Sequence, residues 1–289
     1  ILSHIPKEPN NIVTQYEVHT QGHFLFPRSR RGKRKPMYRF YFGITIKSDN
    51  LTGDNMPRFF VKKDQIQADT VTITGEDARH ISLTLRMKPH ETLILCDGIN
   101  DYNCEIISTE KDRVTANILK HEKNTSEAAV SVSVYQCIPK SDKLETVIQK
   151  CTELGAFEFI PVKSSRCVSK IDPQKEDKKL TRLQKTALEA AKQSDRGVIP
   201  LVHPPLTFEK AVASAAEKGS CILFYENGGV PLKTALQDTE NHISVFVGPE
   251  GGFSEEEVTL AKEHDFSICT LGKRILPTET APVAALSAI

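Results

Sequence analysis

The residues best suited to bind a small ligand lie in the segment VFVGPEGGFSEEE, residues 245–257. Its apolar run ends at Gly248, and a proline, a glutamate and two further glycines follow directly. Glycines at such a place let a ligand approach the backbone closely, and they adopt positive φ angles without strain. Because one glycine is enough for a plain strand-to-helix turn, the three glycines favour a loop that binds a ligand.

The composition of this loop narrows the kind of ligand. Neither of two common phosphate-binding patterns, G-x-x-x-x-G-K-[ST] and G-x-G-x-x-G, occurs in it. The three glutamates that follow, residues 255–257, also disfavour a polyphosphate, because like charges repel. An enzyme that depends on ATP or NAD is therefore the least favoured interpretation.

A second glycine-containing loop, TLGKRILPTETA, spans residues 270–281 and follows the last apolar run. We expect Thr278 to cap a final helix, which tolerates Pro282 in its first turn. Two such loops at neighbouring strand ends, with the segment FYEN at 224–227 as a third wall, would enclose one pocket.

The elements around these loops alternate between strands and helices. Apolar segments predict strands at 130–137, 157–162, 221–226, 243–248 and 266–272. Helical spacing predicts helices at 142–155, near 178–194 and near 255–264. This alternation predicts a parallel sheet covered on both faces, in an α/β domain that spans residues 126–289. Ligands bind such sheets beyond the carboxyl ends of the strands, where the first glycine loop begins.

Two of these helices carry boundary signals. Ser254 with Glu257 three residues later predicts a capping box directly after the first glycine loop. Asp142 is the expected N-cap of the earlier helix, with Glu145 three residues later and Gly155 as its stop.

A separate β domain is predicted at residues 56–125. Short strand-like segments occur at 70–74, 92–98, 101–108 and 113–120, with one short helix among them. The polar segment 121–128 is expected to be a linker. These turn-separated strands favour a small barrel or a compact sheet.

The formal net charge of +1 conceals a basic N-terminal region. Residues 1–55 carry nine Lys and Arg against four Asp and Glu, largely in the run RSRRGKRKPMYR. Such a run can bind nucleic acid, but a solvated, disordered extension outside the domain pattern is the favoured interpretation.

Composition places the rest of the chain among ordinary globular proteins. No apolar run approaches the roughly 18 residues that a membrane span needs. None of the seven cysteines forms a C-x-x-C pair. We therefore expect buried free thiols in a reducing cytoplasm, with no membrane association, disulfide or metal site.

Several segments together resemble a known family. KSDKLETVIQKCTELG, EAAKQSDR, FVGPEGGFSEEE and the pair LGKRIL and TETA are similar to the bacterial 16S rRNA (uracil-N3) methyltransferases of the SPOUT superfamily. MPRFFV and the RHISLTLRM region resemble the N-terminal PUA-like RNA-binding domain of that family. The resemblance covers residues 56–289, with its motifs in the order that the family has.

This resemblance implies a fold and a reaction. The fold would be a small PUA-like β-barrel followed by a SPOUT-type α/β domain with a C-terminal trefoil knot, formed by the loops at 224–227, 248–252 and 271–276. The family acts as a homodimer and uses S-adenosylmethionine to methylate the ring N3 of one uridine in 16S rRNA of the assembled small ribosomal subunit. The implied cofactor-binding residues are Phe224, Glu226, Gly248, Pro249, Glu250, Gly251, Gly252, Leu271, Gly272, Ile275 and Leu276.

The resemblance also implies further site residues. The catalytic candidates are Arg274, Thr278 and Glu279, and the RNA-binding candidates are Lys140, Lys143, Lys150, Arg166 and Arg196. Solvated lysines and arginines with purely local hydrogen bonds are the alternatives for the second group, and a structural role is favoured for His80. The motifs assign no residue to the loss of the uracil N3 proton.

Three features depart from the family pattern. Pro277 stands where the family has an arginine, the chain stops at Ile289 inside the last predicted helix, and residues 1–55 have no counterpart. The missing arginine favours an alternative function, namely a non-catalytic rRNA-binding or ribosome-assembly factor on the same fold.

Overall fold

The computed structural model describes residues 56–169, 173–237 and 239–289. The predicted extension, residues 1–55, lies outside these described residues. Within them, no helix is long and apolar enough to cross a membrane. All seven cysteines are free, and six of them are buried.

The first domain is built on a six-stranded sheet. Its strands are β1 (Arg58–Phe60), β2 (Ile66–Gln67), β3 (Thr70–Thr74), β4 (Thr92–Cys96), β5 (Asn100–Thr109) and β6 (Arg113–Lys123), in the order β1-β4-β5-β6-β3-β2. Only the pairing of β1 with β4 is parallel. The predicted linker at 121–128 is wrong in its first residues, because Tyr102 of β5 pairs with His121 and extends β6 to Lys123.

Short helical segments complete this domain. They are the 3-10 turn Lys63–Gln65, α1 (Gly75–Arg79) and the π-helical turn His80–Leu85. His80 packs edge-on against Phe59, with the ring centroids 5.8 Å apart. Phe59 belongs to the buried core, so this contact agrees with a structural role for the histidine.

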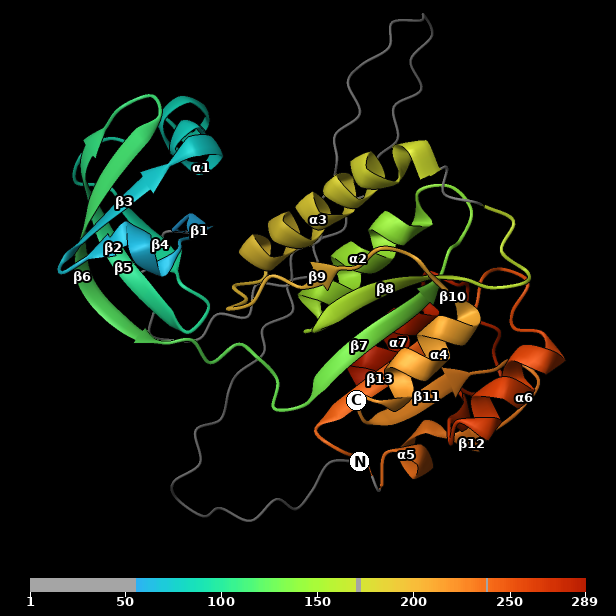
Figure 1. Cartoon of the computed structure of the whole chain (residues 1–289). Helices are drawn as coiled ribbons and strands as arrows, with labels where there is room; N and C mark the ends of the chain where they lie inside the picture. Colours follow the sequence, from blue (N-terminus) through green and yellow to red (C-terminus); the bar gives the residue numbers. More distant parts are fainter. Residues whose placement is uncertain (1–55, 170–172, 238) are drawn as a thin grey trace, which may run out of the picture. The chain divides into compact units, whose positions relative to one another are not determined.

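The second domain contains an all-parallel sheet, as the sequence predicts (Figure 1). Its strands are β7 (Ser131–Cys137), β8 (Glu158–Lys163), β9 (Leu201–Val202), β10 (Leu206–Thr207), β11 (Ser220–Phe224), β12 (Val230–Pro231), β13 (His242–Val247) and β14 (Ser267–Thr270). The order is β10-β8-β7-β13-β11-β14-β12, with β9 beside β8. The strand that leads into the first glycine loop, β13, is therefore central.

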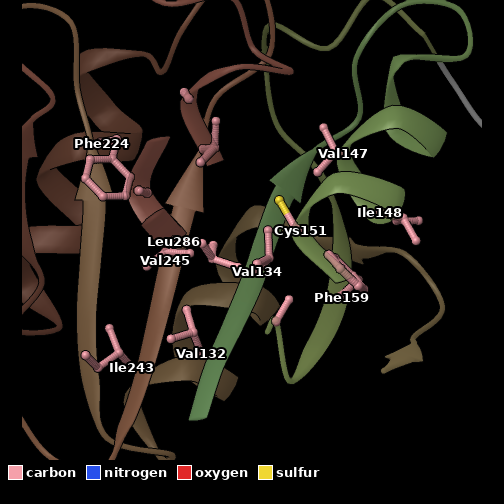
Figure 2. Close-up of a cluster of buried hydrophobic side chains, with 14 of the residues drawn as sticks. Val132, Val134, Val147, Ile148, Cys151, Phe159, Phe224, Ile243, Val245 and Leu286 are labelled. Carbon is pink, nitrogen blue, oxygen red and sulfur yellow. The ribbon is translucent and has the colours of Figure 1, made fainter. Parts of the chain in front are cut away.

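Helices cover both faces of this sheet, which confirms the prediction that the parallel sheet is covered on both sides. They are α2 (Lys143–Glu153), α3 (Glu176–Gln193), α4 (Phe208–Ala216), α5 (Leu232–Ala235), α6 (Glu255–Glu263) and α7 (Ala281–Ala288), with a 3-10 turn at Pro173–Lys175 before α3. On one face, Val134 of β7 belongs to a core with Val147 of α2 and Leu286 of α7 (Figure 2). On the other face, Tyr135 packs with Phe208 of α4. Successive residues of one strand thus enter opposite cores.

The helix boundaries follow the sequence signals in part. Ser254 and Glu257 form the predicted capping box, with the serine hydroxyl accepting from the Glu257 N–H and the carboxylate accepting from the Ser254 N–H. Asp142 is the N-cap residue of α2, although its side chain makes no capping hydrogen bond. Gly155 follows that helix with φ +93°, which explains why the helix ends there.

A buried carboxylate stabilises the sheet at the amino-terminal ends of its strands. Glu158 accepts hydrogen bonds from Ser133 Oγ at 2.6 Å, His203 Nε2 at 2.6 Å and Lys218 Nζ at 2.5 Å. Burial opposes ionisation of this carboxyl, but the hydrogen bonds from Lys218 and Ser133 outweigh it and lower its pKa. Glu158 is therefore ionised in the folded protein at neutral pH.

This cluster predicts how stability changes with acid. Because the pKa of Glu158 is lower in the folded than in the unfolded chain, its contribution is complete above the unfolded value of about 4.3 and is lost as the pH falls through the folded value. Glu158→Gln should lower the free energy of unfolding by about 1.5–3 kcal/mol at pH 7 and reduce its acid dependence. Urea titrations at several pH values measure both effects. Exposed Glu217 is the matched control, and an equal acid dependence in Glu158→Gln and Glu217→Gln would contradict the assignment.

Candidate active site

A cavity of about 570 Å³ lies where β11, β13 and β14 end. Its walls come from three segments far apart in the chain, 224–226, 247–252 and 270–278, together with Lys143 and Ala281. All eleven residues predicted to bind a cofactor line this one cavity. The predicted third wall is present except for Asn227, which is not part of the lining.

The first glycine loop is shaped by backbone geometry. Gly252 has φ +65°, and its N–H donates to the Pro249 carbonyl at 3.0 Å. A Cβ atom on Gly252 would overlap the carboxylate of Glu226. Gly252 therefore needs to be glycine for both its φ angle and its close neighbour.

A buried threonine joins the two loops. The hydroxyl of Thr278 donates to the carbonyl of Gly248 at 2.6 Å and accepts from Gln136 Nε2 at 3.0 Å. The expectation that Thr278 caps the last helix is wrong, because α7 begins at Ala281 and has Thr280 as its N-cap residue. Sequence reasoning missed Gln136, whose only signal is its amide side chain near the end of β7.

Lys143 is a predicted RNA-binding residue, but in the structure its side chain is engaged in two ion pairs at the cavity wall. Its ammonium lies 3.3 Å from Glu250 Oε1 and 3.0 Å from Glu279 Oε2, and its side chain lines the cavity. The hydrogen bond to Glu279, followed by that to Glu250, raises the pKa of Lys143 and keeps it protonated. The lysine thus connects the start of α2 to both loops.

The carboxylate of Glu250 is itself held from several sides. It accepts a hydrogen bond from the Lys140 N–H at 3.1 Å in addition to its ion pair with Lys143. Burial raises its pKa, but hydrogen bonds from its own N–H and from those neighbours lower it overall. Glu250 therefore places a fixed negative charge on the cavity wall.

The other predicted RNA-binding residues are dispersed. Arg166 donates to the Gly251 carbonyl at 3.0 Å, so it braces the glycine loop. Lys150 pairs with Glu153 on the surface of α2. Arg196 is 3% exposed and bonds Glu127, which favours the alternative of local hydrogen bonding at that position.

The remaining basic residues of the cavity are exposed. Lys273 and Arg274 belong to the second loop, and the described part of the chain provides no ion-pair partner for either. The neighbouring Ile275 is 86% exposed. No group of three or more potential metal ligands occurs among the described residues. The cavity thus combines exposed cations, carboxylates in its wall and glycine backbone, which suits a partly charged organic ligand.

Two family models match this chain. The model described as the RNA methyltransferase domain matches residues 126–289. The model described as the RNA methyltransferase PUA domain matches residues 73–119. The first match covers the parallel sheet and the whole cavity, and the second lies within the antiparallel part of the first domain.

Curated proteins and solved structures give the same relationship. The chain is 39% identical over 246 residues to ribosomal RNA small subunit methyltransferase E of Bacillus subtilis, covering 81% of this chain and 96% of that protein. It is 30% identical to the Synechocystis protein of the same name, covering 89% of each. The crystal structure of the Neisseria gonorrhoeae protein of that name, bound to S-adenosyl methionine, has a TM-score of 0.74 at 32% identity and covers 81% of this chain and 96% of that one. A putative methyltransferase from Legionella pneumophila, in complex with the same cofactor, has a TM-score of 0.74 at 28% identity, covering 81% and 97%.

The link through Thr278 can be tested by removing its hydroxyl. Thr278→Val keeps the shape of the side chain but leaves the Gly248 carbonyl and the Gln136 amide without this partner. We expect the free energy of unfolding to fall by about 1–3 kcal/mol, because buried polar groups lose their hydrogen bonds. Thr278→Ser, which keeps the hydroxyl, should lose clearly less. Equal stabilities of the two variants in urea titrations would show that the link does not hold the loops.

Proposed function

We propose a specific reaction for this chain, which belongs to the ribosomal RNA small subunit methyltransferase E family: the transfer of a methyl group from S-adenosylmethionine to the ring N3 of a uridine in 16S rRNA. One observation carries the proposal. The eleven residues that the sequence marks for the cofactor, from three distant segments, line a single cavity. The bound cofactor in the related Neisseria and Legionella structures supports the identity of the ligand.

The residues around the cavity fit this cofactor. Glycines 248, 251 and 252 line the cavity without side chains, so those of their backbone N–H and C=O groups that are not already hydrogen-bonded can recognise adenine. S-adenosylmethionine supplies a methyl group made electrophilic by a positively charged sulfur. The carboxylates of Glu226 and Glu250 line the cavity and attract that positive charge. Lys143 partly neutralises Glu250, which leaves Glu226 as the freer of the two.

The RNA is proposed to approach the rim of the cavity. Lys273 and Arg274 are exposed there and can pair with phosphates without first breaking an ion pair with another described residue. Arg274, Thr278 and Glu279 stay the catalytic candidates, with Thr278 acting through the Gly248 carbonyl that it holds. The target uridine must leave its base stack to reach the cavity.

Three further features belong to the proposal. The substrate is the assembled small subunit, and the PUA-type domain is its second RNA contact. The chain acts as a homodimer, as its resemblance to the family implies. The loops that Thr278 joins form a trefoil knot.

A catalytically inactive assembly factor is the second candidate. It is favoured by Pro277, which replaces the family arginine and whose carbonyl accepts hydrogen bonds from the N–H groups of Thr280 and Ala281. The backbone role of residue 277 is thus fulfilled, but no guanidinium is present. Binding of rRNA without methylation is the property that distinguishes this candidate.

A direct assay tests the proposed reaction. Small subunits that lack the modification are incubated with the purified protein and isotopically labelled S-adenosylmethionine, and the digested rRNA is analysed by mass spectrometry. The proposal expects labelled N3-methyluridine at a single position of 16S rRNA. Cofactor binding with no labelled nucleoside would favour the assembly factor, and a label on another atom or base would exclude N3 specificity.

Gly251→Val should prevent cofactor binding while leaving the fold intact. A Cβ at residue 251 would contact the Cβ of Arg166 at 3.4 Å, an ordinary distance, so the backbone accepts a side chain. The branched valine would press on Arg166, which holds the glycine loop through the Gly251 carbonyl, and displace the loop. We therefore expect the dissociation constant in calorimetry to rise at least about 100-fold, roughly 2.7 kcal/mol. Gly251→Ala should have a smaller effect. Unchanged affinity in the valine variant, with an unchanged melting temperature, would remove Gly251 from the site.

A further inference from the structure

Lys143 is fixed in the cavity wall by two carboxylates from different segments. Glu250 belongs to the first glycine loop and lies 3.3 Å from the ammonium, and Glu279 belongs to the second loop and lies 3.0 Å away. Lys143 itself begins α2. A cation that three separate elements hold in one place is organised before any substrate arrives.

This organisation distinguishes Lys143 from the other basic residues of the cavity. Among the described residues, Lys273 and Arg274 have no ion pair, and both are exposed. Lys143 is 35% exposed through its side chain. An ammonium group has three N–H donors, so two ion pairs leave one donor for a ligand. Its raised pKa keeps that donor present throughout the neutral range.

The proposed reaction requires such a donor. The N3 atom of uracil carries a proton and lies between two carbonyl groups. Its lone pair becomes available for a methyl group when the proton leaves, and the negative charge then spreads to the two carbonyl oxygens. Ionised carboxylates accept hydrogen bonds only, so Glu250 and Glu279 cannot stabilise those oxygens. A fixed cation beside one of them can.

We propose that the ammonium of Lys143 donates a hydrogen bond to a carbonyl oxygen of the target uracil and stabilises the anion left when the N3 proton departs. This assignment rests on the proposed N3 methylation. The N3–H bond breaks with its electrons remaining on nitrogen, and the proton passes to water. Those electrons form the bond to the methyl carbon, and the electrons of the broken carbon–sulfur bond stay on sulfur. Glu250 and Glu279 act as positioning residues for the lysine.

Lys143→Met and Lys262→Met form a pair of variant and control. Lys262 is an exposed residue in the last turn of α6 and does not line the cavity. At neutral pH we expect Lys143→Met to methylate small subunits about 100-fold more slowly and Lys262→Met to match the unaltered protein. The deficit of Lys143→Met should shrink as the pH rises towards about 9.5, because hydroxide then removes the proton without help. Lys143→Arg should restore part of the rate, since it keeps a cation.

A change of substrate tests the role of Lys143 in a second, independent way. Small subunits from cells grown with 5-fluorouracil carry uracil rings with a more acidic N3–H. On these subunits the deficit of Lys143→Met should fall at least about tenfold, because the substrate no longer needs the same stabilisation. The affinity for S-adenosylmethionine, measured by calorimetry, should stay within about threefold of the unaltered protein.

Two results would overturn the assignment. A deficit that is the same at every pH and on fluorinated subunits would mean that Lys143 only supports the structure. A loss of cofactor affinity that accounts for the whole deficit would mean that the lysine binds the cofactor carboxylate instead. If the unaltered protein forms no N3-methyluridine, the proposed function itself fails. If it does and the pH profile of Lys143→Met is unshifted, only this inference fails.

Discussion

The hydrogen bond between the Thr278 hydroxyl and the Gly248 carbonyl joins the two loops on which the cavity depends. Gln136, in a central strand, donates to the same hydroxyl, so the last segment of the chain is tied to the sheet as well as to the first loop. All three residues lie in the interior or at its edge, where polar groups need partners. The geometry of the cavity is therefore set by backbone and buried side chains, whereas Lys273 and Arg274 of the cavity lining are exposed.

The two edges of the parallel sheet use charge differently. At the amino-terminal ends of the strands, Glu158 is surrounded by donors, which is an arrangement that contributes stability. At the carboxyl edge, Lys143 bridges Glu250 and Glu279 beside a cavity and keeps one donor available. This contrast follows from the fold, since loops at the carboxyl ends of parallel strands converge on one place.

The sequence predicts the parallel sheet well, because it depends on local patterns, and the resemblance to the family supplies the residues of the cavity lining. Apolar runs identify strands, and the glycines after β13 predict a ligand-binding loop before any contact is known. The roles of Thr278, Gln136 and Lys143 were not predictable in this way. Gln136 and Thr278 are 142 residues apart, and the carboxylates that hold Lys143 lie more than a hundred positions away in the chain. The role of Arg196 was not predictable from the sequence either. Only its buried contact with Glu127 in the structure favours local hydrogen bonding over RNA binding.

The central claim is that this chain methylates N3 of one uridine in 16S rRNA. Mass spectrometry of small-subunit rRNA from cells with and without the gene tests it most directly. The account predicts one N3-methyluridine that disappears when the gene is deleted and returns when the gene is restored. An rRNA whose modifications are identical in both strains would contradict it.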